Sequence, residues 1–447
     1  MEKEMAGLWQ KGTFSDKALP QGREAIKTRF VFKIKYSADG TVERYKSRLV
    51  ARGFIQNAGV DFFETFSPVV GYDTLRCVIS VATYKGWNIE SQDFTQTYLN
   101  ADLQEEIWLE LPDSRIVKAE KAIYGMKQSA MEWFHELRGT ILAEGWTSSQ
   151  HDECLYFKKS EDGRIVILTT YVDDTATTGD FTEEIQRMRA SLLLKYEGRD
   201  LGMPDKLIGV SITVGEDDIT LDQQLYAESI VVAGMGSMEV RERFTPLGPG
   251  MDLSARQDHE EELDPIIYPY ASILGKLMFL AGMTRPDRAN SVRELGRRAA
   301  SPCIRHWRGL QHVLRYVAGT LDVCIHYDRG NKDMNERDEE LLVGYGDSDW
   351  GTDQQTRRSV TGFIILFNGS PIAWRYKLQG AVTLSSSEAE WRAMAYGMRH
   401  CIFLQGILGE IGILQKQIPW FCDNRGAIQA SSITGFNGRT KHVDIKL

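Results

Sequence analysis

The chain has 447 residues, 42% of them hydrophobic and 26% charged, as in ordinary globular proteins, and its length predicts roughly two to four domains. Its 62 acidic and 53 basic side chains give a formal net charge of −9, which argues against nucleic-acid binding by overall charge alone. No run approaches the roughly 18 apolar residues of a membrane span, the N-terminus has no signal-peptide pattern, and the six cysteines form no Cys-x-x-Cys pair. We therefore expect a cytoplasmic protein with reduced thiols, no membrane contact and no zinc site.

Positive charge is nevertheless concentrated in two segments. Residues 1–60 carry twelve Lys or Arg against six Asp or Glu, and residues 285–315 carry eight Arg against two acids. Acidic stretches at 258–264 and 333–340 lower the total. A groove lined by the basic segments can follow phosphate groups, although solvated charged surfaces give the same pattern.

The predicted elements alternate between strands and helices along the chain. Basic and apolar residues alternate over 26–54, which predicts a β-hairpin with its turn at Asp39-Gly40. Asp73 is a suitable N-cap for the first helix, and Asp93 ends a short strand. The expected helices are residues 73–83, 122–142, 182–196, 224–240, 268–320 and 387–411, and further hairpins are expected over 165–179 and 206–222.

An apolar run that ends in two acids is the most informative pattern. Residues 165–172 are mostly apolar or β-branched, Asp173 and Asp174 follow, and residues 175–179 again favour a strand, which predicts a hairpin with an acidic tip. Asp93 is expected at the end of a neighbouring strand. Carboxylates gathered there repel one another unless divalent cations neutralise them, and two such ions promote in-line attack on phosphate. The alternative is an ordinary turn, where Asp pairs are common.

Residues 341–447 have a pattern of their own. Three strands, a long helix, a short strand and a second helix predict a compact α/β domain. Asp347 follows its first strand, Glu388 begins its long helix, Asp423 ends its fourth strand, and Asp444 comes near the end. Four such carboxylates can hold two magnesium ions for phosphodiester hydrolysis.

Some of these carboxylates have a structural alternative. Glu388 fits the last position of a capping box that begins at Ser385, and Asp423 can cap a helix. Asp347 and Asp349 compete for one position, and the sequence leaves that choice open.

Eight short segments carry a family resemblance. They are residues 44–54 (RYKSRLVARGF), 66–70 (FSPVV), 92–100 (QDF to YLN), 122–128 (AIYGMKQ), 171–174 (YVDD), 384–390 (LSSSEAE), 422–424 (CDN) and 439–444 (RTKHVD). In this order they resemble the reverse transcriptase–ribonuclease H portion of the Pol polyprotein of copia-type LTR retrotransposons. The resemblance extends over nearly the whole chain and implies that the chain is a fragment of such a polyprotein.

The resemblance implies an α/β (α+β) right-hand polymerase followed by a ribonuclease H-like domain. The fingers and palm would occupy residues 1–222, a thumb residues 223–250, a helical connection residues 251–340, and the ribonuclease H domain residues 341–447. The implied partners are an RNA template, a DNA primer, the RNA–DNA hybrid and deoxynucleoside triphosphates. A cytoplasmic virus-like particle is the implied location, and a homodimer is left open.

The resemblance also implies roles for individual residues. Two Mg²⁺ ions, with Mn²⁺ as a substitute, would be held at each of two active sites. The implied polymerase ligands are Asp93, Asp173 and Asp174, and the implied ribonuclease H ligands are Asp347, Glu388, Asp423 and Asp444. The implied nucleotide-binding residues are Lys46, Arg48, Tyr98, Gln128 and Tyr171; Lys46 and Arg48 would clamp the triphosphate and Tyr98 would exclude a ribose 2′-hydroxyl.

Two functions therefore compete. The first is an RNA- and DNA-directed DNA polymerase that also degrades the RNA of its hybrid product. The second is a decayed or domesticated copy that keeps the fold and binds nucleic acid without catalysis. Seven carboxylates present in family order favour the enzyme.

Overall fold

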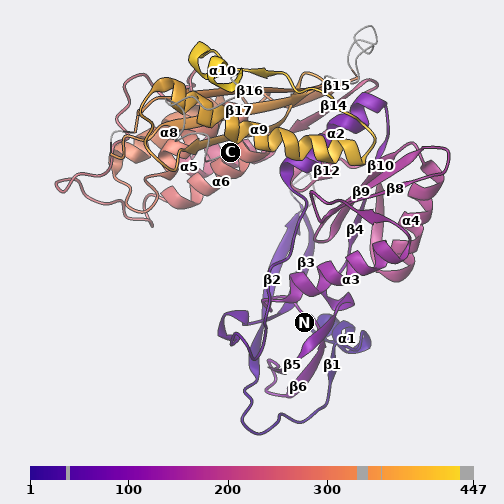
Figure 1. Cartoon of the computed structure of the whole chain (residues 1–447). Helices are drawn as coiled ribbons and strands as arrows, with labels where there is room; N and C mark the ends of the chain where they lie inside the picture. The colour runs from indigo at the N-terminus through magenta and orange to yellow at the C-terminus, as the bar shows by residue number, and fades with distance from the viewer. Residues whose placement is uncertain (37–40, 330–340, 354, 433–447) are drawn as a thin grey trace. The chain divides into compact units, whose positions relative to one another are not determined.

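The computed structural model describes residues 1–36, 41–329, 341–353 and 355–432, and Figure 1 shows a mixed α/β chain with several sheets, as expected. The chain divides into two compact units, Met1–Val70 with Ile89–Met203 and Gly71–Asn88 with Pro204–Leu447. The predicted turn at Asp39-Gly40 and the carboxylate Asp444 lie outside the described residues. No helix in the described ranges is both long and apolar enough to cross a membrane.

The first unit contains two sheets. Its five-stranded sheet has the order β1 (Phe14–Ser15), β6 (Ile116–Lys121), β5 (Asp102–Glu110), β2 (Ile26–Tyr36), β3 (Val42–Ala51). Its six-stranded sheet has the order β11 (Gly198–Gly202), β4 (Ile89–Phe94), β10 (Asp174–Gly179), β9 (Ile165–Tyr171), β8 (Leu155–Lys159), β7 (Thr147–Ser148). The helices are α1 (Glu2–Gln10), η1 (Gly53–Ile55), η2 (Thr97–Asn100), α3 (Ser129–Ala143) and α4 (Thr182–Lys195). Both predicted hairpins of this unit are confirmed, since β2 pairs with β3 and β9 with β10.

Helices α3 and α4 cover the six-stranded sheet through one apolar cluster. Trp133 and Leu137 of α3 and Met188 and Leu192 of α4 pack with Val166 of β9. Strand β9 is buried up to its last residue, which accounts for its continuous apolar sequence. The predicted helix over 122–142 begins only at Ser129, because the residues before it form a turn attached to β3.

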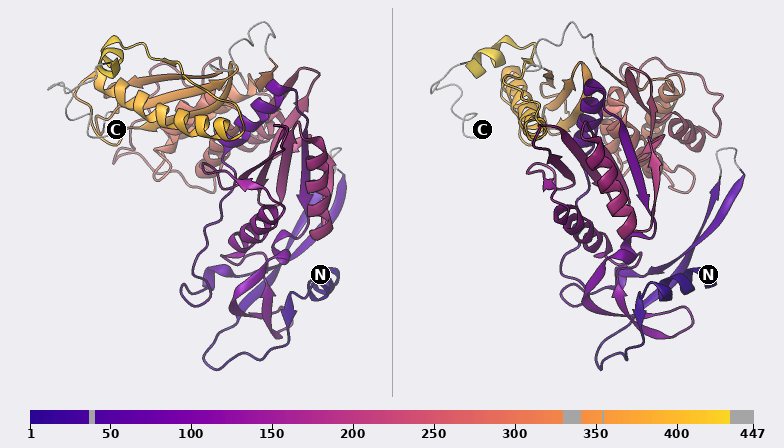
Figure 2. Two further views of the ribbon diagram at one scale, coloured as in Figure 1. Left: turned by 45° about the vertical axis from the view of Figure 1, so that its right-hand side comes forward. Right: turned by 90° about the vertical axis from the view of Figure 1, so that its right-hand side faces the viewer.

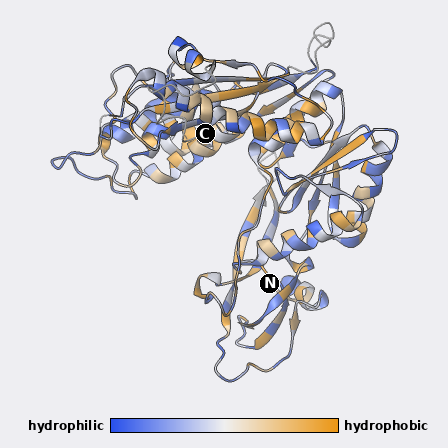
Figure 3. Cartoon of the chain, in the orientation of Figure 1, coloured by the Kyte–Doolittle hydropathy of each residue, from blue (hydrophilic) through white to orange (hydrophobic). Residues whose placement is uncertain are grey.

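The second unit also contains two sheets. One has the order β12 (Lys206–Leu207), β13 (Val210–Val214), β14 (Asp218–Asp222), β15 (Ile325–Asp328), and the other has the order β18 (Ser370–Leu378), β17 (Val360–Phe367), β16 (Leu342–Asp349), β19 (Trp420–Phe421). Strand β19 runs parallel to β16, and the other pairs are antiparallel. The long helix α9 (Ser386–Glu410) packs along β16 and β17, and both views of Figure 2 show it beside this sheet. Helix α10 (Arg425–Ser432) follows β19. Figure 3 shows hydrophobic residues along the strands of this second sheet.

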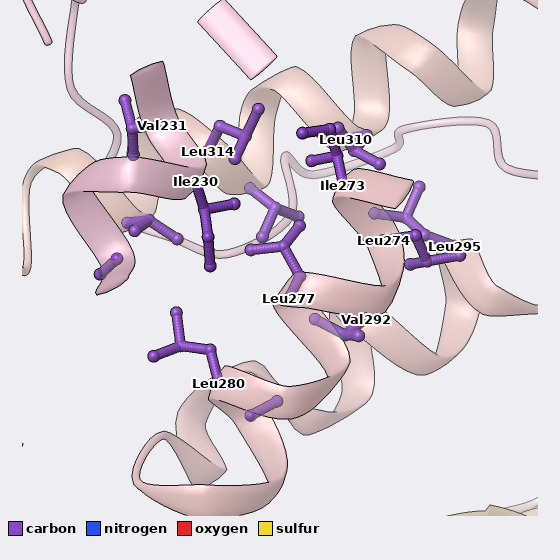
Figure 4. Close-up of a cluster of buried hydrophobic side chains, with 14 of the residues drawn as sticks. Ile230, Val231, Ile273, Leu274, Leu277, Leu280, Val292, Leu295, Leu310 and Leu314 are labelled. Carbon is purple, nitrogen blue, oxygen red and sulfur yellow. The ribbon is translucent and has the colours of Figure 1, made fainter. Parts of the chain in front are cut away.

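A helical layer in the second unit shares one core. Its helices are α5 (Gln224–Met235), α6 (Tyr270–Met283), η3 (Pro286–Arg288), α7 (Ala289–Gly296) and α8 (Ile304–Ala318). Figure 4 shows Ile230 and Val231 of α5 beside Leu277 of α6 and Leu314 of α8. All four side chains are completely buried. Helix α5 buries its apolar side in the same cluster as α6 to α8. The division between a thumb at 223–250 and a connection at 251–340 stays a prediction.

Helix α2 (Tyr72–Lys85) belongs to the second unit and is anchored by buried charges. Its N-cap is Gly71, so the prediction of an Asp73 cap is wrong. The Asp73 carboxylate instead accepts hydrogen bonds from Arg76 at 2.6 Å and from Arg375 of β18 at 2.8 Å. Arg76 also lies 3.8 Å from the ring centroid of Trp374 and donates to the Gly282 carbonyl at 2.8 Å. A buried charge pair of this kind ties α2 to α6 and β18, because removing one partner leaves the other unpaired.

Candidate functional site

The predicted acidic hairpin in the first unit has a two-residue turn. Strand β9 ends at Tyr171 and β10 begins at Asp174, so Val172 and Asp173 form the turn. Val172 has a φ of 56°, which β-branched residues disfavour. The Trp133 indole N–H donates a 2.6 Å hydrogen bond to the Val172 carbonyl, and the Phe94 N–H donates a 2.9 Å bond to the Asp173 carbonyl. These bonds hold the strained turn and fix the direction of its carboxylates.

Strand register brings the three predicted polymerase carboxylates together. Asp174 lies directly opposite Asp93 in the antiparallel pair of β10 and β4, where Cβ atoms are about 5 Å apart. Burial, together with the negative charges of Asp173 and Asp93, raises the pKa of Asp174 to about 6. Carboxylate oxygens are the ligands that Mg²⁺ prefers, so these residues are candidate ligands, although their oxygens do not all lie within 4.8 Å of one another in the structure.

Two tyrosines and an arginine lie beside these carboxylates. The rings of Tyr98 and Tyr124 meet edge to face with centroids 4.9 Å apart, and the Arg48 guanidinium carbon lies 4.2 Å from the Tyr124 centroid. Burial raises the pKa of both tyrosines, the charge of Asp173 raises it further, and Arg48 opposes this. Arg48 and Tyr98 are therefore near Asp173, as the resemblance implies. Tyr124 was missed by sequence reasoning, although it lies within the quoted segment 122–128.

The turn that carries Tyr124 is attached to the end of β3. The Ala51 N–H donates a 2.8 Å hydrogen bond to the Tyr124 carbonyl. Gly125 has a φ of 91°, and a Cβ at this position would lie 2.2 Å from the Ala51 carbonyl oxygen, so no side chain fits there. Because Arg48 belongs to β3, this attachment holds its guanidinium over the Tyr124 ring.

The structure corrects the interpretation of Gln128. Its side chain is completely buried, and its amide nitrogen donates to the Asp61 carbonyl at 2.8 Å and to Glu105 at 3.2 Å. Its oxygen accepts a 3.0 Å bond from Gln56. A buried amide with these partners supports the neighbouring loop and has no surface to offer to a nucleotide.

Two further nucleotide-binding predictions concern residues beside the first site. Lys46 lies two residues from Arg48 on β3, so the strand alternation directs both to one face. Tyr171 pairs in register with Asp174 across the hairpin. Nucleotide contact by Lys46 or Tyr171 stays a prediction.

A second carboxylate cluster lies in the second unit and consists of Asp347, Glu390 and Asp423. Burial raises the pKa of Glu390 to about 7, and the charges of Asp347 and Asp423 contribute to this rise. Ligand atoms of Glu390, Cys422 and Asp423 lie within 4.8 Å of one another. Burial also raises the pKa of the Cys422 thiol, which keeps it protonated, so the three carboxylates are the better donors for a hard ion such as Mg²⁺.

Glu390 replaces Glu388 as the helix carboxylate of this cluster. The Ser385 hydroxyl accepts a 3.1 Å bond from the Glu388 N–H, and Glu388 accepts a 2.8 Å bond from the Leu384 N–H. Glu388 also forms a 2.6 Å ion pair with Arg392. The capping alternative is therefore the one the structure shows, and Glu388 is turned to the helix start while Glu390 reaches Asp347.

The structure also decides between Asp347 and Asp349. Asp349 accepts a 2.6 Å hydrogen bond from the Val360 N–H, whereas Asp347 hydrogen-bonds to Glu390. Asp347 and Asp423 line an open cavity of about 730 Å³, whose walls include the stacked rings of Tyr345 and Phe421 with centroids 5.0 Å apart. Asp444, the fourth carboxylate of the predicted ribonuclease H set, lies outside the described residues.

The first site thus consists of Asp173 at a hairpin turn, Asp174 at the start of the following strand, and Asp93 opposite it on the adjacent strand. A family model described as "Reverse transcriptase (RNA-dependent DNA polymerase)" matches residues 12–247. Because this match covers more than half of the 447 residues, the chain belongs to that family.

Relatives among retrotransposon polyproteins match the chain from end to end. The retrovirus-related Pol polyprotein from transposon TNT 1-94 of Nicotiana tabacum is 32% identical over 100% of this chain and 34% of its own length. The corresponding polyprotein from transposon RE2 of Arabidopsis thaliana is 31% identical over 95% of this chain and 29% of its own length. The chain thus spans about a third of the length of these curated relatives.

The raised pKa of Asp174 predicts a pH- and cation-dependent stability. An Asp whose pKa is raised in the folded state binds its proton more tightly than in the unfolded chain, so folding loses stability as the pH rises from about 4 to above 6. We expect Asp174→Asn to raise the melting temperature of chelator-treated protein by a few degrees at pH 8, with a smaller effect towards pH 4. Added Mg²⁺ should then stabilise the wild type more than the variant. A lower melting temperature for the variant at pH 8 would contradict the proposed repulsion.

Proposed function

We propose that the chain copies RNA and DNA templates into DNA at the first site and cleaves the RNA of an RNA–DNA hybrid at the second. The observation that carries the proposal is the register of Asp174 opposite Asp93 with Asp173 in the adjoining turn, and the raised pKa that results. Family membership supports the polymerase part. The second cluster, in a domain that the matched family segment does not include, supports the ribonuclease H part.

Asp93, Asp173 and Asp174 would hold two Mg²⁺ ions at the first site, and Asp347, Glu390 and Asp423 would hold two at the second, with Mn²⁺ as a substitute. When bound, such ions lower the pKa of the attacking hydroxyl or water and neutralise charge on the phosphate. The hydrogen bond from Trp133 to the Val172 carbonyl fixes the turn that carries Asp173.

The chain's own cations and aromatic rings would bind the nucleotide. Arg48 is held over Tyr124 near Asp173, where a guanidinium can donate to the triphosphate of a bound deoxynucleotide. Lys46 would contribute a second positive charge from the same strand face. Tyr98, half-buried beside Asp173, would close the space next to the sugar and so exclude a 2′-hydroxyl.

The proposal includes a right-hand arrangement of fingers, palm and thumb, a connection and a ribonuclease H domain, with template, primer and hybrid as partners. The helices of the 223–320 region share one core, which supports treating thumb and connection as one layer. The proposed location is a virus-like particle in the cytoplasm, and the proposed partners include a second copy of the chain in a homodimer.

Primer extension tests the polymerase part directly. A labelled RNA template annealed to a DNA primer is incubated with Mg²⁺ and deoxynucleotides, and full-length DNA is expected for the wild type. Asp173→Asn should reduce extension to background because one of three carboxylates is lost, whereas Asp205→Asn, an exposed aspartate outside both sites, should not. No extension by the wild type in Mg²⁺ or Mn²⁺, with hybrid binding retained, would favour the non-catalytic nucleic-acid-binding protein.

The position of Arg48 predicts a role for Tyr124 in nucleotide binding. Tyr124→Leu removes the ring face below the guanidinium and should raise the KM for deoxynucleotides by about tenfold with little change in kcat. Tyr124→Phe keeps the ring and should stay within about twofold of the wild type. Equal values for the Leu and Phe variants in steady-state extension would show that the ring does not position Arg48.

Hybrid cleavage distinguishes Glu390 from Glu388. With a labelled RNA strand, Glu390→Gln should abolish cleavage because Glu390 belongs to the carboxylate cluster. Glu388→Gln is the matched control: it weakens a helix cap, should lower the melting temperature slightly, and should retain most of the cleavage. Loss of cleavage in Glu388→Gln and retention in Glu390→Gln would show that Glu388, and not Glu390, acts with Asp347 and Asp423.

A further inference from the structure

The outer part of the β2–β3 hairpin extends away from the rest of its sheet, as the right view of Figure 2 shows. Among the described residues, β2 pairs with β5 only at Ile26 and Lys27, whereas its pairing with β3 continues from Thr28 to Tyr36. Strand β3 is the edge of the five-stranded sheet. An edge strand of this length presents unpaired peptide groups on which a further strand can form.

The outward peptide groups of β3 follow from its register with β2. The Ala51 N–H points away from β2, because it donates a 2.8 Å hydrogen bond to the Tyr124 carbonyl. Successive residues of an antiparallel strand direct their peptide groups alternately toward and away from the neighbouring strand, so Ser47 and Tyr45 also direct theirs outward. No acceptor for these two N–H groups occurs in the part of the chain that the structure describes.

One face of the hairpin is apolar and open to solvent. Strand register places Phe32, Ile34 and Tyr45 on this face, and their side chains are 66%, 42% and 79% exposed. Phe30 lies on the same face nearer to the sheet, with its ring centroid 6.3 Å from that of Phe32, and packs against the buried core of the sheet. Exposed apolar side chains that continue from a core are typical of a surface that another protein covers.

The opposite face of the hairpin is basic. It carries Arg29 and Lys33 of β2 and Arg44, Lys46 and Arg48 of β3. Arg29, Lys33 and Arg44 are exposed, and no carboxylate of the described residues lies within 4.0 Å of these three. A strand added to β3 would therefore meet apolar side chains on one face and positive charge on the other.

The charge of β3 disfavours a second copy of the same strand as the partner. In an antiparallel pair of two such strands, Arg44, Lys46 and Arg48 would face the same cations of the other copy, and like charges in opposition destabilise a sheet. Nucleic acid would use the basic face but would leave Phe32 and Tyr45 in water and the edge of β3 unpaired. The three features together fit a protein strand in which acidic and apolar residues alternate.

We propose that the edge of β3 binds an extended segment of a partner protein as an additional strand. Acidic residues of that segment lie beside Arg44 and Lys46, and its apolar residues cover the exposed apolar face. Its backbone carbonyls accept hydrogen bonds from the outward N–H groups of Tyr45 and Ser47. The inference is independent of the proposed function, because strand addition needs neither carboxylate cluster.

A peptide-binding assay with the full-length chain tests the required pattern. The probe is a labelled peptide of about seven residues in which Glu and Val alternate, and the comparison peptide has the same composition with all its Glu residues at one end. The alternating peptide should bind about tenfold more tightly, because only its pattern sends the two residue types to opposite faces. Equal affinity for the two peptides would show attraction by charge alone and would overturn the proposal.

Substitution of Ser47 tests the backbone hydrogen bonds. Ser47→Pro removes an outward N–H without removing a bond to β2, and should weaken binding of the alternating peptide by about tenfold. Ser47→Ala keeps this N–H and is the matched control, for which we expect the wild-type affinity. Equal affinities of the two variants, at an unchanged melting temperature, would contradict strand addition.

Side-chain changes test the two faces without altering the backbone. Tyr45→Gln removes apolar surface and Arg44→Gln removes a cation, and each should weaken binding by about fivefold. Phe66→Gln changes an aromatic side chain that is 78% exposed elsewhere in the same unit, and should bind like the wild type. Wild-type affinity in both the Tyr45 and the Arg44 variant would overturn the proposal.

A labelled single-stranded RNA distinguishes the other class of ligand. Binding of this RNA that depends on Arg44, with no binding of the alternating peptide, would show a nucleic-acid surface and would also overturn the proposal. Because no turnover is measured, the result does not depend on whether the chain extends primers. A failure here and a failure of the proposed function can therefore be told apart.

Discussion

Carboxylates that lie close together and are half-buried repel one another, and both candidate sites of this chain contain such a group of carboxylates. Asp93 and Asp173 raise the pKa of Asp174 to about 6, and Asp347 and Asp423 contribute to raising that of Glu390 to about 7. Bare clusters of this kind destabilise the fold at neutral pH, so they are retained most easily where divalent cations bind. The same cost explains why the surrounding packing has to be rigid.

The fold resists this repulsion through contacts that are not themselves part of the chemistry. At the first site, Trp133 holds the carbonyl of Val172 in a backbone conformation that valine disfavours, and Gly125 allows the Tyr124 turn to lie against β3. At the second site, the cap at Ser385 starts α9 so that Glu390 faces the sheet. In each case the contacts hold the end of a strand or helix in place, and this determines the direction of the functional side chain.

Sequence patterns predicted the hairpin, its acidic tip and the opposition of Asp93 because these depend on local alternation and strand register. They selected Glu388 as the ligand instead of Glu390, because both stand in one short segment and only the cap geometry separates them. Gln128 and Tyr124 could not be told apart by sequence for a similar reason. The placement of each depends on partners that are distant in sequence, such as Gln56 and Ala51. Helix α5 likewise shares its core with helices far along the chain, and this packing depends on contacts that are distant in sequence.

The most direct test of the account is to locate metal ions bound to the first site. Crystals of the full chain with a primer–template and a non-reactive deoxynucleotide analogue would be grown with Mn²⁺, and its anomalous scattering measured. The account predicts two manganese peaks in contact with the carboxylates of Asp93, Asp173 and Asp174. A nucleotide bound beside Arg48 with no manganese among these three carboxylates would contradict it.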